Sequence, residues 1–158
     1  MMLLRSIATN VLATWRGRGG VSAVEFAVAA PVLVALLIPL VDLGIALYEQ
    51  VEVNTAAQAG ADYALLKAPA FNSTAISSAV TGATGFSAIS SNPAPSQSCG
   101  CPSTTGITAA TCGAVCGTGQ SAGTYVTVNA QASYTPMISY AGLSGTITLS
   151  SQSTVRIK

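Results

Sequence analysis

The chain has 158 residues, of which half are apolar and only 7% are charged, against about 25% in ordinary soluble domains. From Ala68 to Val155 it contains no Asp, Glu, Lys or Arg. A nucleic-acid binder needs clustered Lys and Arg on its folded part, and this sequence does not supply them. The composition therefore indicates a membrane-associated protein that does not bind nucleic acid.

An uncharged, almost wholly aliphatic stretch runs from Phe26 to Val41. Counted from Val21 it has 21 residues, which as a helix rise about 30 Å, one hydrocarbon thickness. A helix that is apolar on every face needs lipid or a large protein around it, and this chain is short. Three arginines precede the stretch and no cation follows before Lys67, so the positive-inside rule predicts a cytoplasmic N-terminus. A secretory signal peptide would have a shorter apolar core, which makes a secreted module the weaker alternative.

Glu25 is an acid at the start of this apolar stretch, five positions after Gly20. A carboxylate inside a membrane costs a few kcal/mol and usually has a partner. The preceding basic and glycine-rich residues, 16–20, form a flexible stretch that a protease at the membrane surface could hold extended, because glycine disfavours a helix. Cleavage after Gly20 would create an amino group on Val21, and Glu25 of one subunit could pair with that group on the next. The simpler interpretation is that Glu25 reaches the cytoplasmic interface.

Basic residues and glycines before the span are followed by the short motifs Ala23-Val24-Glu25-Phe26-Ala27, Ala30-Pro31, Val41-Asp42-Leu43-Gly44 and Gly60-Ala61. Through these residues the segment 16–66 resembles the TadE-like pseudopilins of bacterial tight-adherence pilus systems. The resemblance implies a minor pilin-like component that a dedicated prepilin peptidase processes at Gly20-Val21, with Glu25 as the acid that guides assembly. Phe26 stands where the main fibre subunits more often have tyrosine, and this favours a pseudopilin.

Residues 43–67 continue with helix formers, so we expect one transmembrane and stalk helix over 21–67, ended by Pro69. Asn72 predicts a cap for a short helix reaching about Thr81, and a loop follows to Ser98. Apolar residues alternate over 124–134 and 145–157, which predicts two strands joined by a connection at 136–142. The expected fold is α+β: a long N-terminal helix, then a small disulfide-bonded domain with a short helix and an antiparallel β pair or small sheet.

Four cysteines, Cys99, Cys101, Cys112 and Cys116, form a cysteine-rich loop at 99–116. Their spacing is also compatible with a four-thiolate zinc site, but the predicted topology places them in an oxidising compartment. No basic residue flanks them in the sequence to stabilise thiolates. We therefore expect two disulfides, with Cys99 and Cys101 cross-paired to Cys112 and Cys116, and no metal; the sequence leaves open which cross-pairing forms.

The sequence gives no basis for catalysis, since histidine is absent and the outer region has no acid to act as a base. We expect no enzyme activity and no cofactor. The expected organisation is a cleaved cytoplasmic leader at 1–20, the helix at 21–67 and an extracytoplasmic domain at 68–158, in a bacterial inner membrane. Expected partners are the prepilin peptidase, other pilin-like subunits, inner-membrane assembly proteins and lipid. The alternative is an unprocessed, single-pass envelope protein whose head binds a surface partner.

Overall fold

The computed structural model describes residues 20–137 and 145–158, with the side chain of Val21 left out. The predicted leader, apart from Gly20, and most of the predicted connection at 136–142 lie outside the described residues. The chain divides into two compact units, one ending at Leu43 and one running from Gly44 to Lys158.

The longest element is the helix α2, Gly20–Leu66, which contributes to both units. It ends three residues before Pro69, as the sequence predicted, because the residue preceding a proline is pushed out of helical geometry. The short helix α3, Ser73–Thr81, follows. Its cap is Asn72, whose side-chain oxygen accepts a hydrogen bond from the Ala75 N–H at 3.0 Å.

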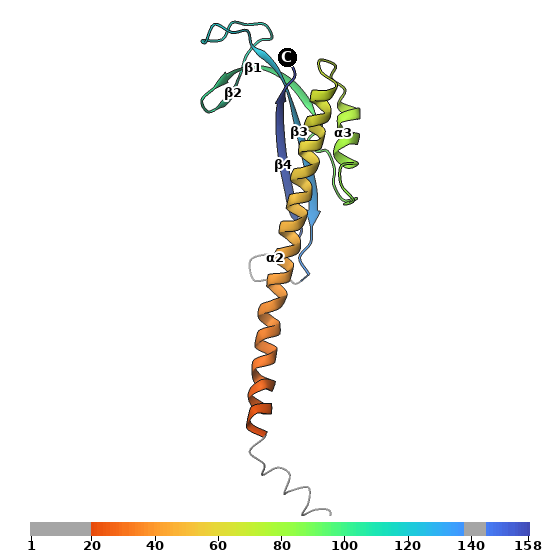
Figure 1. Cartoon of the computed structure of the whole chain (residues 1–158), viewed down its shortest axis with the longest axis vertical. Helices are drawn as coiled ribbons and strands as arrows, with labels where there is room; N and C mark the ends of the chain where they lie inside the picture. Colours follow the sequence, from red (N-terminus) through yellow and green to blue (C-terminus); the bar gives the residue numbers. More distant parts are fainter. Residues whose placement is uncertain (1–19, 138–144) are drawn as a thin grey trace, which may run out of the picture. The chain divides into compact units, whose positions relative to one another are not determined.

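The second unit contains a four-stranded antiparallel sheet in the order β2-β1-β3-β4 (Figure 1). The strands are β1, Ser96–Ser103; β2, Gly106–Ala109; β3, Gly123–Tyr134; and β4, Ile147–Arg156. The alternation in the sequence predicted β3 and β4. It did not predict β1 and β2, and β1 begins inside the segment expected to be a loop. The predicted class, α+β with a long N-terminal helix and a disulfide-bonded domain, is confirmed.

The two faces of the sheet differ in chemistry. Alternate residues of β3, including Val126 and Val128, are buried in a core with α3 and the C-terminal half of α2. From Thr127 to Ser133, the intervening residues of β3 and their partners on β4, residues 148–154, form a face of neutral polar side chains. Thr127 and Thr154 are hydrogen-bonded there at 3.2 Å, and the Gln152 amide donates to Asn129 Oδ1 at 3.0 Å.

Small residues allow the C-terminal half of α2 to lie close to the sheet. Ala56, Ala57, Gly60, Ala61 and Ala64 are all buried. Small residues spaced four apart on a helix let another backbone approach closely, and in the structure these residues pack on a strand and a short helix. A Cβ added at Gly60 would lie 2.5 Å from Val80 Cγ2 and 2.8 Å from Val128 Cγ1, so the position has no room for a methyl group.

Gly60→Ala is expected to lower the free energy of unfolding by about 1–3 kcal/mol, because the added methyl overfills the core. The matched control is Gly44→Ala on the same helix, where an added Cβ meets nothing within 4 Å. Replacing that glycine should stabilise the helix by about 0.5–1 kcal/mol. Chemical denaturation of the full chain in detergent, followed by circular dichroism, measures both. Equal stabilities of the two variants would contradict the packing described for α2.

Candidate functional site

The first unit presents an apolar helix surface with no covering element among the described residues. Its large apolar side chains, from Val24 to Val41, are mostly more than half exposed. Within the described residues, α2 is the one helix long and apolar enough to cross a membrane. Exposing such a surface to water costs about 25 cal/mol for each Å², so lipid or neighbouring helices must cover it. The chain thus has the organisation of a single-pass membrane protein.

The predicted processing and assembly residues lie at the start of this helix. Gly20 is helical and exposed, and a Cβ added there meets nothing within 4 Å, so packing does not require a glycine at this position. Glu25 and Phe26 are both exposed, and Phe26 is 71% exposed. Val21 belongs to the helix, but its side chain lies outside the described part. No hydrogen bond or ion pair within the described residues involves Glu25.

Two prolines lie inside the apolar part of α2, Pro31 and Pro39. A proline has no N–H, so each leaves the carbonyl four residues earlier without its helical donor. The affected carbonyls belong to Ala27 and Ala35. Both are in the segment that would lie in lipid, where water cannot satisfy them, so a neighbouring polar group or a local bend has to compensate.

Asp42 closes the apolar stretch and is only 4% exposed. An acid directly after an apolar span is expected at the far membrane interface, where a carboxylate costs little. Asp42 is the one acidic or basic side chain classed as buried in the part of the chain that the structure describes. Its burial is a feature that hydropathy alone did not indicate.

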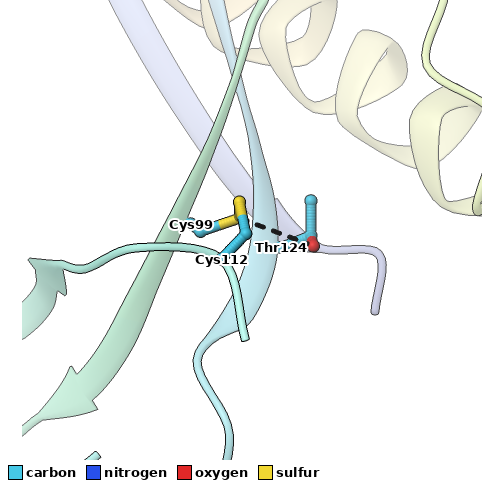
Figure 2. The surroundings of a disulfide bond; sticks show 3 residues. All are labelled: Cys99, Cys112 and Thr124. Carbon is cyan, nitrogen blue, oxygen red and sulfur yellow. Dashed lines mark hydrogen bonds between the residues drawn. A yellow bond between two sulfur atoms is a disulfide. The ribbon is translucent and has the colours of Figure 1, made fainter. Parts of the chain in front are cut away.

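The second unit holds the four cysteines as two disulfides, Cys99–Cys112 and Cys101–Cys116. The prediction of disulfides is confirmed, and this connectivity is one of the two cross-pairings that the sequence left open. Cys99 Sγ lies 3.8 Å from Thr124 Oγ1 (Figure 2). Because a disulfide sulfur carries no proton, the threonine hydroxyl is the donor. Each of the four sulfurs is bonded in one of these two disulfides, so none of them is a thiolate that could bind zinc.

Sequence reasoning missed the cations that lie beside one disulfide. Arg156 and Lys158 line a hollow together with Cys112, Gly113 and the segment 121–124. The Arg156 Nε–H donates to the Lys158 main-chain oxygen at 2.9 Å, and the Thr124 N–H donates to the same oxygen at 2.9 Å. No basic residue flanks the cysteines along the sequence, but the fold brings Arg156 and Lys158 beside Cys112.

Glu52 has a partner on its own helix. A hydrogen bond to Glu52, with a smaller contribution from its charge, raises the pKa of the Tyr48 hydroxyl. The two residues are four positions apart, the spacing at which side chains meet on one helix face.

Comparison with known proteins bears on the N-terminal part of the chain. The family model for TadE-like proteins matches residues 20–62, which is most of α2 and none of the sheet. No curated protein and no solved structure matches the chain. The matched segment contains the exposed apolar surface, Glu25 and Phe26, and it agrees with the resemblance seen in the sequence. Over residues 20–62, the chain is similar to TadE-like proteins.

Proposed function

We propose that this chain is a minor pilin-like subunit, a pseudopilin, needed for assembly of a tight-adherence type IV pilus or a related secretion apparatus. The observation that carries the proposal is the coincidence of the TadE-like match with an exposed apolar helix whose one acid before Asp42 is Glu25. The proposed role is structural and not catalytic.

The proposed mechanism begins with cleavage after Gly20 by a prepilin peptidase. The new amino group on Val21 then pairs with Glu25 of a neighbouring subunit inside the membrane. Each charge alone would cost a few kcal/mol in lipid, so the pair favours association over separate insertion. Val21 and Glu25 are four residues apart on the helix, which corresponds to an offset of about 6 Å between neighbouring helices. The pair would fix this axial register.

The proposed location is a bacterial inner membrane, with the leader in the cytoplasm and residues 68–158 outside it. The arginines before α2 support this orientation. The two disulfides support an oxidising compartment for the C-terminal domain. The proposed partners are the prepilin peptidase, other pilin-like subunits, the inner-membrane assembly proteins and lipid.

The test is the intact mass of the chain isolated from its native membrane. We expect a mature protein that starts at Val21, and a protein that starts at Met1 when the peptidase is removed. A start at Met1 in normal cells would contradict processing and favour the anchored envelope protein whose head binds a surface partner. A start beyond Leu47 would contradict both membrane proposals.

A variant at the junction sharpens this test. Gly20→Ala should leave α2 intact, since a Cβ at that position meets no neighbour, and should slow cleavage because it makes the segment more helical. The control is Gly44→Ala, which has the same open surroundings but lies far from the junction. We expect unprocessed chain to accumulate only with Gly20→Ala.

A further inference from the structure

The charges of the second unit are segregated. Its three acids, Glu49, Glu52 and Asp62, all lie on α2. Its three cations are Lys67, Arg156 and Lys158. The acids and the cations of this unit are equal in number, but the described residues contain no ion pair between them. Lys67 directly follows α2, whereas Arg156 and Lys158 lie at the end of β4; a small domain with acids and these two cations on separate surfaces is complementary to another copy of itself.

Asp62 is the acid of this unit that is best placed to meet a partner. It is exposed on the side of α2 that faces away from the sheet, whereas Glu49 and Glu52 are each partly buried. Glu52 is engaged with Tyr48. No hydrogen bond or ion pair within the described residues involves Asp62. Its neighbours Leu65 and Leu66 are also exposed, 45% and 83%, and give the carboxylate an apolar flank.

The hollow lined by Arg156 and Lys158, called the basic hollow below, offers the complementary group. Arg156 and Lys158 are both exposed, and the Arg156 Nε–H is held by the Lys158 main-chain oxygen. That bond orients the guanidinium while leaving its terminal nitrogens to bind a carboxylate. Gly123 provides the space, because a Cβ there would lie 2.6 Å from Arg156 Nε. Val115, 76% exposed on the same cysteine-rich loop, gives this surface an apolar flank of its own.

The two groups lie on opposite surfaces of the domain, so they cannot pair within one copy. α2 packs on the face of the sheet that carries Val126 and Val128. Arg156 is the register partner of Tyr125, and directly paired residues share a face. Tyr125 alternates with Val126, so Arg156 lies on the face turned away from α2.

The two groups also lie at the same height along the domain. The Gln50 amide donates to the Ser150 carbonyl at 3.1 Å, which ties α2 to β4 at one level. From there the two elements run in the same direction (Figure 1). Asp62 is twelve residues further on the helix, about 18 Å. Arg156 is six residues further on the strand, about 20 Å. A second copy placed beside the first in the same orientation therefore brings the two groups to nearly the same level, and the long side chains of Arg156 and Lys158 can span the offset of about 6 Å proposed for neighbouring helices.

We propose that Arg156 and Lys158 of one copy bind Asp62 on α2 of a second copy that lies beside it in the same membrane. The contact joins two different surfaces, so the first copy keeps a free Asp62 and the second keeps a free basic hollow, and further copies can add in a row. A single exposed ion pair is weak. Anchoring in one membrane raises the effective concentration of the second copy, which makes a weak contact sufficient. The inference rests on the proposed function only in requiring that several copies share a membrane.

The test is zero-length carbodiimide cross-linking of the full chain in its native membrane. This reagent joins a lysine amine to a carboxylate in contact with it. We expect a covalent dimer on a denaturing gel, with mass spectrometry of the band identifying a Lys158–Asp62 linkage. Asp62→Asn should reduce the dimer about fivefold or more, while the matched control Glu52→Gln should leave it unchanged.

A charge exchange separates loss of the contact from loss of the fold. Arg156→Glu with Lys158→Glu should abolish the dimer, and adding Asp62→Lys in the same chain should restore it with the linkage reversed. A dimer that persists in Asp62→Asn, a linkage to Glu52, or an adduct of Lys158 with a different protein would each overturn the proposal. The mature N-terminus, which tests the proposed function, is read independently in the same membranes.

Discussion

Replacing Glu25 with Ala is expected to leave the chain inserted in the membrane but to reduce pilus assembly by at least about tenfold. Removing the carboxylate makes the apolar helix easier to insert, because an acid in lipid costs a few kcal/mol. The same change removes the partner of the Val21 amino group, and losing about 1.4 kcal/mol of association free energy is already a tenfold effect. Membrane extraction at alkaline pH measures insertion, and electron microscopy of surface pili measures assembly.

The matched control for Glu25 is Glu52→Gln, which removes a carboxylate from the same helix outside the apolar stretch. It should assemble normally. Glu25→Gln should behave like Glu25→Ala, since an amide cannot neutralise an amino group. Normal piliation with either substitution at position 25 would contradict the charge-pairing mechanism while leaving the membrane assignment intact.

Removing the Cys101–Cys116 disulfide is expected to lower the free energy of unfolding of the C-terminal domain by about 3 kcal/mol. The bond closes a loop with a sequence separation of 15, for which the loss of loop entropy in the unfolded chain is of this size. Cys116 is only 5% exposed, so the vacated space adds to the cost. The change is Cys101→Ala with Cys116→Ala, and denaturation by urea in detergent measures it.

The Cys99–Cys112 bond provides an internal comparison, with a sequence separation of 13. Its removal should cost a similar amount, because the entropy depends only weakly on loop length. Ser98→Ala, at an exposed position of β1 whose side chain has no hydrogen bond within the described residues, is the control and should change stability by less than about 0.5 kcal/mol. An unchanged midpoint in the double alanine variants would mean that this loop does not contribute to the fold.

Local signals were sufficient for the elements that depend on near neighbours. Pro69 ends α2 and Asn72 caps α3, because both effects act within a few residues. Alternation gave β3 and β4, which pair at ten positions; β3 buries one face, and the same face of β4 is half-buried. These elements could be predicted because the core side of β3 is apolar, and that of β4 is apolar at Leu149 and Val155.

The strands β1 and β2 could not be predicted, because β1 has no apolar side and β2 has only four residues, all of them exposed. The sequence of β1, SQSCGCPS, shows no alternation and contains glycine and proline, which ordinarily disfavour strands. A glycine is needed at position 100, because a Cβ there would collide with Ile107 and Thr108 of β2. Pro102 lies beyond the part of β1 that pairs with β3. Pairing with distant residues and two disulfides impose this structure.

The candidate sites divide in the same way. Gly20, Glu25 and Phe26 could be recognised from the sequence because the motif that they form depends only on their spacing along one helix. The basic hollow joins Cys112 to Arg156, 44 positions later in the sequence, through the register of β3 with β4. The pairing that brings such residues together follows from the whole sheet, and a local pattern cannot contain it.

The neutral polar face of the sheet has a consequence for proton linkage. Stability changes with pH only when the folded and unfolded chains bind different numbers of protons. Between Ala68 and Val155 there is no acid, no lysine, arginine or histidine, and the cysteines are oxidised. The bonds between Thr127 and Thr154 and between Gln152 and Asn129 join neutral groups, so salt does not screen them. Acidification and changing ionic strength therefore leave this part of the domain with the same charge and the same hydrogen bonds.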